Sequence, residues 1–387
     1  MALLPQELFD AIIDKIHDKE TLKACALLSS AFLPPSQRKL FRKVLIGLGR
    51  RSRNTTTALA ESPHLVSYIR DLTIVMPSTV PISVAVAGVL RSVQNIESLV
   101  VSGIAPGVNW NSVEHEARST LLDCLLRPSL RSLQLSGMQD VSAALISAAT
   151  AVPVVSFFDI RMDVREEISE QLHASAPAPR LRRLTLGDAG PAVRPICDFL
   201  LHPRKPAYTQ QIERLSIRID QDNASYAGRI MAACAATLKY LVVNPKDITR
   251  LPLLPFVLEF EIKVWVGYDR RLPAFFSQNI SQIASSIPLA ETITLAVFVR
   301  PIHPGPEIQW ADEAPLPIFG PSFMDRAQLL HLRRVHCILR RQGPFDDISA
   351  LFDRFVLAME SMMPGLRGTG ILRCTLDNPQ QRSTTAP

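Results

Sequence analysis

The sequence predicts an α/β protein in which a short helical segment is followed by a long solenoid of stacked strand–helix units. Two observations favour this class. A short apolar motif returns along most of the chain, and segments with helical periodicity separate its copies. The chain opens differently, because its first residues carry apolar side chains at the spacing of amphipathic helices. The two parts are therefore expected to differ in architecture.

Composition bounds the size and environment of the molecule. The chain has 387 residues, of which 47% are hydrophobic, so it can bury a substantial core in two domains or one elongated one. The longest apolar run, 80–90, is too short to cross a bilayer. Glu7, Asp10 and Asp14 stand where a signal peptide would be basic. We therefore expect neither export nor a membrane partner.

The six cysteines are scattered singly, without a C-x-x-C pair. Such cysteines are typical of reduced core residues, so we expect a cytoplasmic or nuclear protein. The net charge is +6, and a basic cluster lies between Arg38 and Arg53. Because basic clusters without alternating aromatic residues are usually solvated faces, no nucleic-acid partner is expected.

Three short helices are expected at the start of the chain. Pro5 suits the first position of a helix, and the apolar residues after it share one face at about 100° per residue. Asp18 is a suitable N-cap for a second helix over 20–30, which is apolar nearly all round. The prolines at 34–35 begin a third helix that ends near Phe41. The excess apolar surface must contact the rest of the chain or a partner.

Three stretches occur here in a particular order: LPQELFDAIIDKI, LKACALLSSAF and RKLFRKVLI. This pattern resembles an F-box, in the form common to large fungal families of such proteins. The resemblance implies binding to the Skp adaptor of an SCF-type ubiquitin ligase with its cullin-type scaffold, while the rest of the chain selects the substrate. It also implies that the adaptor-binding residues are those matching the apolar positions of the motif: Leu4, Pro5, Leu8, Ile12, Ile13, Ile16, Leu22, Cys25 and Leu28. The alternative is that residues 1–46 only cap the solenoid.

An apolar-x-x-Leu-x-apolar motif recurs through the remainder. Its clear copies are IRDLTI (69–74), IESLVV (96–101), LRSLQL (130–135), LRRLTL (181–186), IERLSI (212–217) and LKYLVV (238–243). Further strands are expected at 154–161, 260–264, 292–297 and 372–376. The intervening segments predict helices: SVAVAGVLRSV, EARSTLLDCLL, VSAALISAAT, RPICDFLL, SYAGRIMAACAAT and FFSQNISQIASSI.

This alternation of one strand and one helix per unit resembles an irregular leucine-rich repeat. One strand–helix unit cannot bury its apolar face alone, so such units stack and build a continuous core. The resemblance implies a horseshoe-like solenoid over 47–376, with the strands on its concave side. A compact Rossmann-like sheet is the alternative, but the chain lacks the Gly-rich first turn of that fold. The proline-rich segment 301–322 is expected to be a long loop, and 377–387 a polar tail.

Residues between the buried leucines of each strand should point out along the concave side. Arg, Tyr and Trp dominate interface energetics, and arginines suit an acidic or phosphorylated motif. We therefore predict a substrate-binding surface formed by Arg183, Arg214, Arg218, Tyr240, Lys263 and Trp265. The alternative is that these residues are only the exposed side of an ordinary repeat.

No motif for catalysis is present. The chain contains no H-E-x-x-H, no G-x-S-x-G and no Walker A loop. We therefore predict a non-catalytic binding subunit that needs no cofactor and no metal. A repeat scaffold that never meets a ligase and an enzyme of unrecognised type are the alternatives.

Overall fold

The computed structural model describes residues 5–47, 50–76, 84–104, 107–162, 178–187, 193–202, 208–245, 251–266, 283, 285–299, 331–341, 348–363, 366 and 368–377. The chain divides into two compact units. Unit 1 comprises residues 1–181 and 188–199, and unit 2 comprises residues 182–187 and 200–387. The predicted loop at 301–322, most of the helix predicted around 275–287 and the tail after Asp377 lie outside the described residues.

Unit 1 begins with three helices and continues as alternating strands and helices. Its helices are α1 (Gln6–Lys15), α2 (Lys19–Leu28), α3 (Leu33–Phe41), α4 (Arg50–Glu61), α5 (Pro63–Val66), α6 (Val84–Ser92), α7 (His115–Leu125) and α8 (Ala143–Ala149), with a 3-10 turn at Trp110–Ser112. Its strands are β1 (Lys43–Ile46), β2 (Asp71–Met76), β3 (Ser98–Gly103), β4 (Val108–Asn109), β5 (Ser132–Val141) and β6 (Val154–Met162). Helix α10 (Val193–Leu200) falls almost entirely within this unit.

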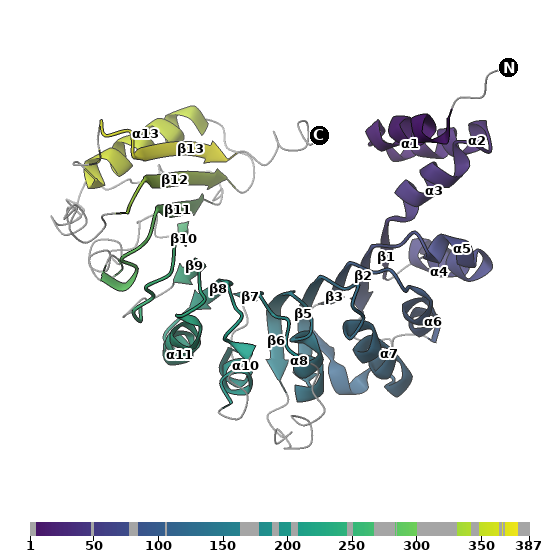
Figure 1. The fold of residues 1–387 in the computed structure, drawn as a ribbon, viewed down its shortest axis with the longest axis horizontal. Helices are drawn as coiled ribbons and strands as arrows, with labels where there is room; N and C mark the ends of the chain where they lie inside the picture. The colour runs from purple at the N-terminus through teal and green to yellow at the C-terminus, as the bar shows by residue number, and fades with distance from the viewer. Residues whose placement is uncertain are drawn as a thin grey trace, which may run out of the picture. The chain divides into compact units, whose positions relative to one another are not determined.

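The strands of unit 1 form one parallel sheet. Their order is β1-β2-β3-β5-β6, and β4 pairs with the far end of β5. Leu72, Leu99, Leu133 and Val155 are register partners on successive strands and are all buried. Figure 1 shows α4 to α8 along one face of this sheet, where they cover the buried rows. The other face carries the alternate residues.

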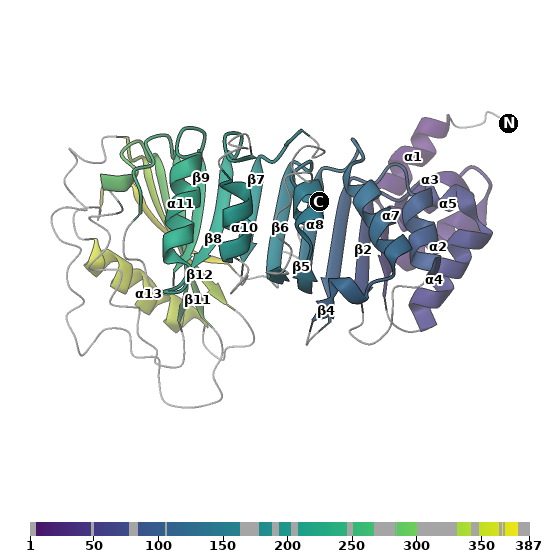
Figure 2. The same ribbon diagram turned by 90° about the horizontal axis from the view of Figure 1, so that it is seen from below.

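Unit 2 repeats this plan. Its strands are β7 (Arg183–Gly187), β8 (Arg214–Ile219), β9 (Tyr240–Pro245), β10 (Glu259–Val266), β11 (Thr292–Val299), β12 (Arg334–Arg341) and β13 (Leu372–Asp377), paired in that order and all parallel. Its described helices of eight or more residues include α11 (Ala224–Cys234) and α13 (Ile348–Met362). Figure 2 shows α11 in front of β8 and β9, so this helix covers one face of the sheet.

A backbone ladder joins the residue that precedes each strand to its counterpart in the next repeat. The carbonyl oxygen of Arg182 accepts from the N–H groups of Glu213 (2.9 Å) and Arg214 (3.1 Å). The carbonyl of Glu213 accepts in the same way from Lys239 and Tyr240, and unit 1 repeats the pattern at Arg42, Arg70 and Glu97. Each repeat therefore starts at the same height as its neighbour, which keeps the strands in register.

The predicted class, α/β with parallel strands alternating with helices, is confirmed. Strands lie at every predicted position. The helices predicted at 83–93, 116–126, 141–150, 194–201 and 225–237 are present at 84–92, 115–125, 143–149, 193–200 and 224–234. The periodicity missed β12, α4 and α13. The boundary between residues 46 and 47 stays a prediction, although β1 already pairs with β2 as the first strand of the sheet. No helix among the described residues has the length and apolar content to cross a membrane.

Candidate functional site

The helices α1, α2 and α3 form a helical group with its own buried contacts. Ile13 of α1 and Leu22 of α2 are buried, and the ring of Phe9 packs edge-on against that of Phe32 with centroids 4.8 Å apart. Lys39 Nζ of α3 donates to the carbonyl oxygen of Ile13 at 3.0 Å, at the end of α1 where a positive charge is favourable. The group is therefore held together by packing and by a cation at a helix end.

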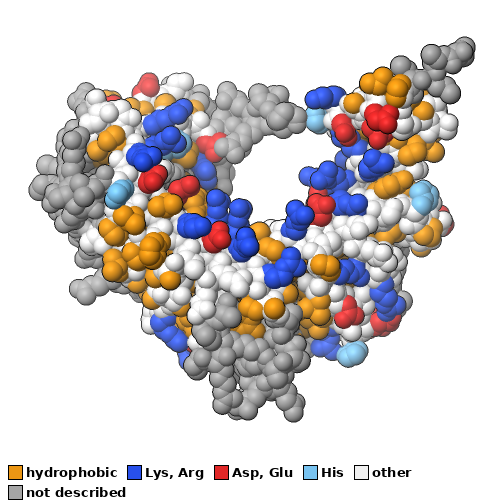
Figure 3. All heavy atoms as spheres, viewed as in Figure 1, with side chains coloured by type: hydrophobic (Ala, Val, Ile, Leu, Met, Phe, Trp, Pro, Cys, Tyr) orange, Lys and Arg blue, Asp and Glu red, His pale blue; other side chains and the backbone are white. Residues whose placement is uncertain are grey.

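The outer surface of the helical group carries large apolar side chains. Leu8 and Ile12, one turn apart on α1, are 48% and 49% exposed. Leu27 and Leu28, at the end of α2, are 87% and 72% exposed. Figure 3 shows hydrophobic side chains on the surface of these helices. Covering a fully exposed side chain of this kind with a partner would contribute about 1.5–3 kcal/mol, and covering the half-exposed Leu8 or Ile12 correspondingly less.

The nine residues that the F-box resemblance implicates differ in exposure. Pro5, Leu8, Ile12 and Leu28 are exposed, Ile16 and Cys25 are half-buried, Ile13 and Leu22 are buried, and Leu4 lies outside the described residues. The two buried residues support the helices and offer no surface in this chain. The F-box motif did not identify Leu27 as an exposed apolar residue. Its position in a helix that is apolar nearly all round could have indicated it.

All six residues predicted for substrate binding lie on one face of the unit 2 sheet. This open face consists of the strand residues that alternate with the buried rows. Arg183, Arg214 and Tyr240 are register partners along its first row. Arg218 and Lys263 lie on β8 and β10 at positions with the same alternation, and Trp265 follows Lys263 by two residues. The strand pairing therefore brings together residues that are up to 82 positions apart in the sequence.

A buried carboxylate lies at the centre of the open face. Glu261 on β10 is only 8% exposed, and its Oε2 accepts a hydrogen bond of 2.7 Å from the hydroxyl of Tyr240. Its Oε1 lies 3.9 Å from both Lys263 Nζ and Arg340 Nη1. Burial, and then the hydrogen bond to Glu261, raise the pKa of Tyr240 well above its ordinary value. The phenol therefore stays protonated and remains a donor.

The C-terminal strands extend this network. The Nε of Arg340 on β12 lies 3.2 Å from Oδ2 of Asp377 on β13, and its guanidinium lies over the ring of Phe298 at 5.3 Å. Phe298 in turn stacks on Trp265 with ring centroids 4.5 Å apart. Two aromatic rings and a guanidinium thus form a continuous column across β10, β11 and β12.

His336 on β12 lies among arginines. Its Nε2 is 2.7 Å from Oγ1 of Thr375 on the neighbouring strand. Burial, and then the charges of Arg373, Arg334 and Arg340, lower the pKa of His336. The His336 side chain is therefore neutral at pH 7, and its lowered pKa reflects its burial and the positive charges around it. The sequence pattern missed these residues because β12 was not predicted, although RVHCILRR alternates apolar and polar positions.

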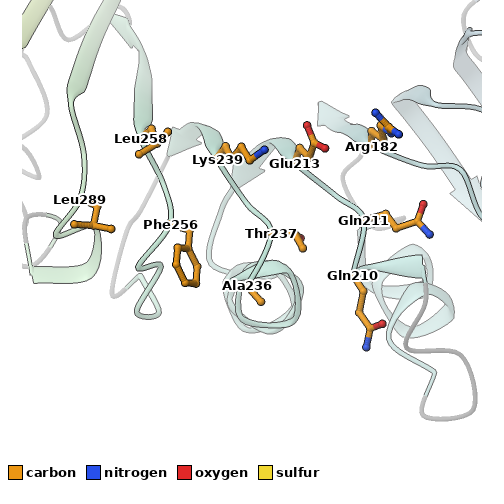
Figure 4. A pocket seen from close by; sticks show the side chains of 10 residues that line it. All are labelled: Arg182, Gln210, Gln211, Glu213, Ala236, Thr237, Lys239, Phe256, Leu258 and Leu289. Atoms are coloured by element: carbon orange, nitrogen blue, oxygen red, sulfur yellow. The ribbon is translucent and has the colours of Figure 1, made fainter.

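A groove of about 700 Å³ lies along the amino-terminal ends of the unit 2 strands (Figure 4). Four residues of the backbone ladder, Arg182, Glu213, Lys239 and Leu258, line it together with the exposed Phe256. The carbonyl oxygens of the ladder already accept backbone hydrogen bonds. The groove mixes charges of both signs and holds none of the predicted site residues.

Two cysteines face each other near the C-terminal edge of unit 2. Cys337 and Cys374 are register partners on β12 and β13. A hydrogen bond between the two thiols, and then burial, raise the pKa of Cys337, whereas the same bond lowers the pKa of Cys374.

Among the described residues, no three His, Cys, Asp or Glu side chains are placed to hold a metal ion.

No protein-family model matches the chain, and no curated protein matches it.

Proposed function

We propose that this protein is the substrate-receptor subunit of an SCF-type ubiquitin ligase. In this role the helical group docks on the Skp adaptor, which joins it to the cullin-type scaffold. The strand–helix repeats are irregular leucine-rich repeats, and their open face binds a protein target. The chain itself needs no catalytic residue, because the ligase chemistry belongs to the partner subunits, and it would act in the cytoplasm or nucleus.

The exposed apolar surface of the helical group carries this proposal. Its large apolar side chains are between 48% and 87% exposed and are not packed inside the group: Leu8, Ile12, Leu27 and Leu28. Exposed apolar side chains on neighbouring helices are typical of a protein interaction surface. The sequence of the same helices has the F-box pattern, so the exposed residues and the motif support the same partner.

The alternative is a repeat scaffold whose helical group only caps the solenoid. A cap is expected to turn its apolar side chains toward the first repeat and a polar face outward. Ile13 and Leu22 are buried within the helical group, whereas Leu8 and Ile12 remain exposed on its surface. This exposure favours docking over capping.

The test is a calorimetric titration of the full chain with a Skp adaptor from the same source. Two variants, Ile12→Asp and Leu28→Asp, each place a charge on the exposed surface. If this surface docks on the adaptor, each should weaken binding about 30-fold or more, because a charge would be buried in the interface. Circular dichroism should show that both variants stay folded, since neither side chain is part of the core.

The matched control is Leu126→Asp. Leu126, at the end of α7, is 49% exposed, as Ile12 is, but it lies outside the helical group. It should leave adaptor affinity within about twofold. A folded wild-type chain that does not bind the adaptor would contradict the proposal and support the scaffold.

A further inference from the structure

The open face of unit 2 carries a strong excess of positive charge. Among its described strand residues, seven cations face three carboxylates, which leaves an excess of four. The cations are Arg183, Arg214, Arg218, Lys263, Arg334, Arg340 and Arg373, and the carboxylates are Glu259, Glu261 and Asp377. Figure 3 shows Lys and Arg side chains with fewer Asp and Glu over this part of the molecule.

The strands of unit 1 carry no such excess of positive charge. Their charged residues are two cations, Lys43 and Arg161, and three carboxylates, Asp71, Asp140 and Asp159. Lys43 and Asp71 lie 3.9 Å apart. The same strand–helix plan is therefore built without a cationic face. Stacking of the repeats does not require the arginines of unit 2, so their excess indicates a ligand.

The positive charges form two groups. The first arginine group consists of Arg183, Arg214 and Arg218 on β7 and β8. The second consists of Arg334, Arg340 and Arg373 on β12 and β13, and within it Arg340 is paired with Asp377. In the strands between them, Lys263 is paired with Glu261, and this carboxylate also binds Tyr240. The centre of the face is therefore locally compensated. Arg214 and Arg334 lie in one register row, with Glu259 between them.

We propose that the open face binds an extended protein segment with two acidic clusters separated by a short neutral stretch. One cluster contacts the first arginine group and the other contacts the second, and the neutral stretch passes Glu259 between them. This inference rests on the proposed substrate-receptor role, because it names the kind of target segment that the role requires.

The strand spacing sets the length of the segment. Neighbouring strands lie about 4.8 Å apart, so β8 and β12 are separated by roughly 19 Å. An extended chain advances about 3.3 Å per residue, so about six residues span this distance. The two acidic clusters should therefore be separated by about six residues.

A protein segment fits this face better than a nucleic acid. Glu259 is exposed between the two arginine groups, and Glu261 lies beside it in the same strand. An unbroken row of phosphates would have to pass these carboxylates, whereas a peptide can place neutral residues there. Phe298 already stacks on Trp265 and lies under Arg340, so one of its ring faces is not available to a base.

The experiment uses the full chain and fluorescein-labelled synthetic peptides, with fluorescence anisotropy as the readout. The test peptide has three Glu, a six-residue Gly/Ser spacer and three Glu. A second peptide replaces every Glu with Gln, and a third places all six Glu together before the same spacer. A 15-nucleotide single-stranded dT serves as the nucleic-acid probe.

We expect the test peptide to bind, and to bind more weakly as salt is added, because the contacts are ionic. Arg214→Glu and Arg334→Glu each remove one arginine group's contact and should raise the Kd roughly fivefold to tenfold. The control Arg354→Glu, an exposed position on α13 with the same change of charge, should leave the Kd within about twofold. Arg214→Gln and Arg334→Gln provide milder changes if a reversal lowers the melting temperature.

Several outcomes would overturn the inference. Equal affinity for the Gln peptide would exclude charge recognition, and equal affinity for the contiguous Glu peptide would exclude two separate groups. Tighter binding of the dT probe, with displacement of the peptide, would make this a nucleic-acid surface. The adaptor titration is independent of these results. Peptide binding without adaptor binding contradicts the ligase role alone, and adaptor binding without peptide binding contradicts this inference alone.

Discussion

The hydroxyl of Tyr240 donates a 2.7 Å hydrogen bond to Oε2 of Glu261, diagonally across two neighbouring strands. In the strand register Tyr240 lies opposite Glu259, and Glu261 is two residues further along β10. The bond therefore depends on both the pairing and the alternation of the strands. It holds a carboxylate that is 8% exposed at the centre of the open face.

Removing the hydroxyl should destabilise unit 2. Tyr240→Phe leaves Oε2 of Glu261 buried without this donor, and the loss should cost about 1–3 kcal/mol of unfolding free energy. Urea unfolding followed by circular dichroism measures it. Tyr68→Phe is the control, because Tyr68 is also half-buried and its side chain makes no hydrogen bond among the described residues.

A double-mutant cycle separates this bond from general effects of the substitution. Glu261→Gln removes the charge that Tyr240 compensates, so Tyr240→Phe should cost less in that background. Equal costs in both backgrounds would show that the hydrogen bond contributes nothing specific.

Replacing two of the glycines with alanine should change the unfolding free energy in opposite directions. Gly137 has a φ of +60°, and a Cβ there would overlap the carbonyl oxygen of Gly103 on β3. Gly137→Ala should therefore lower the unfolding free energy by about 1–3 kcal/mol or more. Gly88 lies within α6, and a Cβ there would meet nothing within 4 Å.

Gly88→Ala should raise the unfolding free energy by about 0.5–1 kcal/mol, since Ala is the better helix former. Urea midpoints of the two variants give the comparison directly. A Gly137→Ala variant as stable as wild type would mean that β3 and the kinked part of β5 are not held in this close approach.

His336 should make stability depend on pH. Its pKa is lowered in the folded chain by burial and by the charges of Arg373, Arg334 and Arg340, so below its unfolded pKa, near 6.5, the unfolded state binds more protons. The contribution is fully present above that pKa and is lost as the pH falls through the lowered folded value. Acidification from pH 7.5 to 5.5 should therefore destabilise the wild type.

His336→Gln should show a smaller loss of stability over the same range of pH, because it cannot be protonated. The measurement is the urea midpoint of each protein at pH 7.5 and 5.5. Parallel pH curves for the two proteins would exclude His336 as the source of the effect.

The facing cysteines should differ in reactivity. Cys374 is half-buried and its pKa is lowered by the hydrogen bond from Cys337, whereas Cys337 is buried and its pKa is raised. Because the thiolate is the nucleophile, iodoacetamide should modify Cys374 severalfold faster than Cys337 in the native chain. Peptide mass mapping at pH 8 measures both rates.

Cys337→Val removes the hydrogen-bond donor and should slow the modification of Cys374. The modification of Cys25, which is half-buried in α2, provides the internal standard. An unchanged rate at Cys374 would show that its reactivity does not depend on its partner.

Local patterns were sufficient to predict much of the fold. The motif copies at 69–74, 96–101 and 212–217 became β2, β3 and β8, each shifted by two residues toward the C-terminus. Asp18 caps α2 as predicted, with its carboxylate accepting from the N–H of Thr21 at 2.7 Å. These features depend on neighbouring residues, so the sequence carries them directly.

The helical group shows that local sequence patterns do not predict which apolar side chains of a helix are buried. Periodicity placed Ile12 and Ile13 on the same apolar side of α1, yet Ile13 is fully buried and Ile12 is 49% exposed. The difference depends on how α1 rests against α3, through contacts such as that of Lys39 with the carbonyl of Ile13. A helical wheel describes one helix and contains no information on the position of another.

By itself the sequence determined the order of most strands and helices, because the apolar periods of the two differ. It also determined the apolar rows and the side of the sheet on which Arg183 and Trp265 lie, because these follow from the two-residue period of a strand. Only the tertiary structure decided that β12 and β13 extend the same face, and that Arg340 meets Glu261 and Asp377 there. These residues come from strands separated by tens of residues in the chain. Their contacts depend on the register of strand pairing, which is set by the packing of all the repeats together.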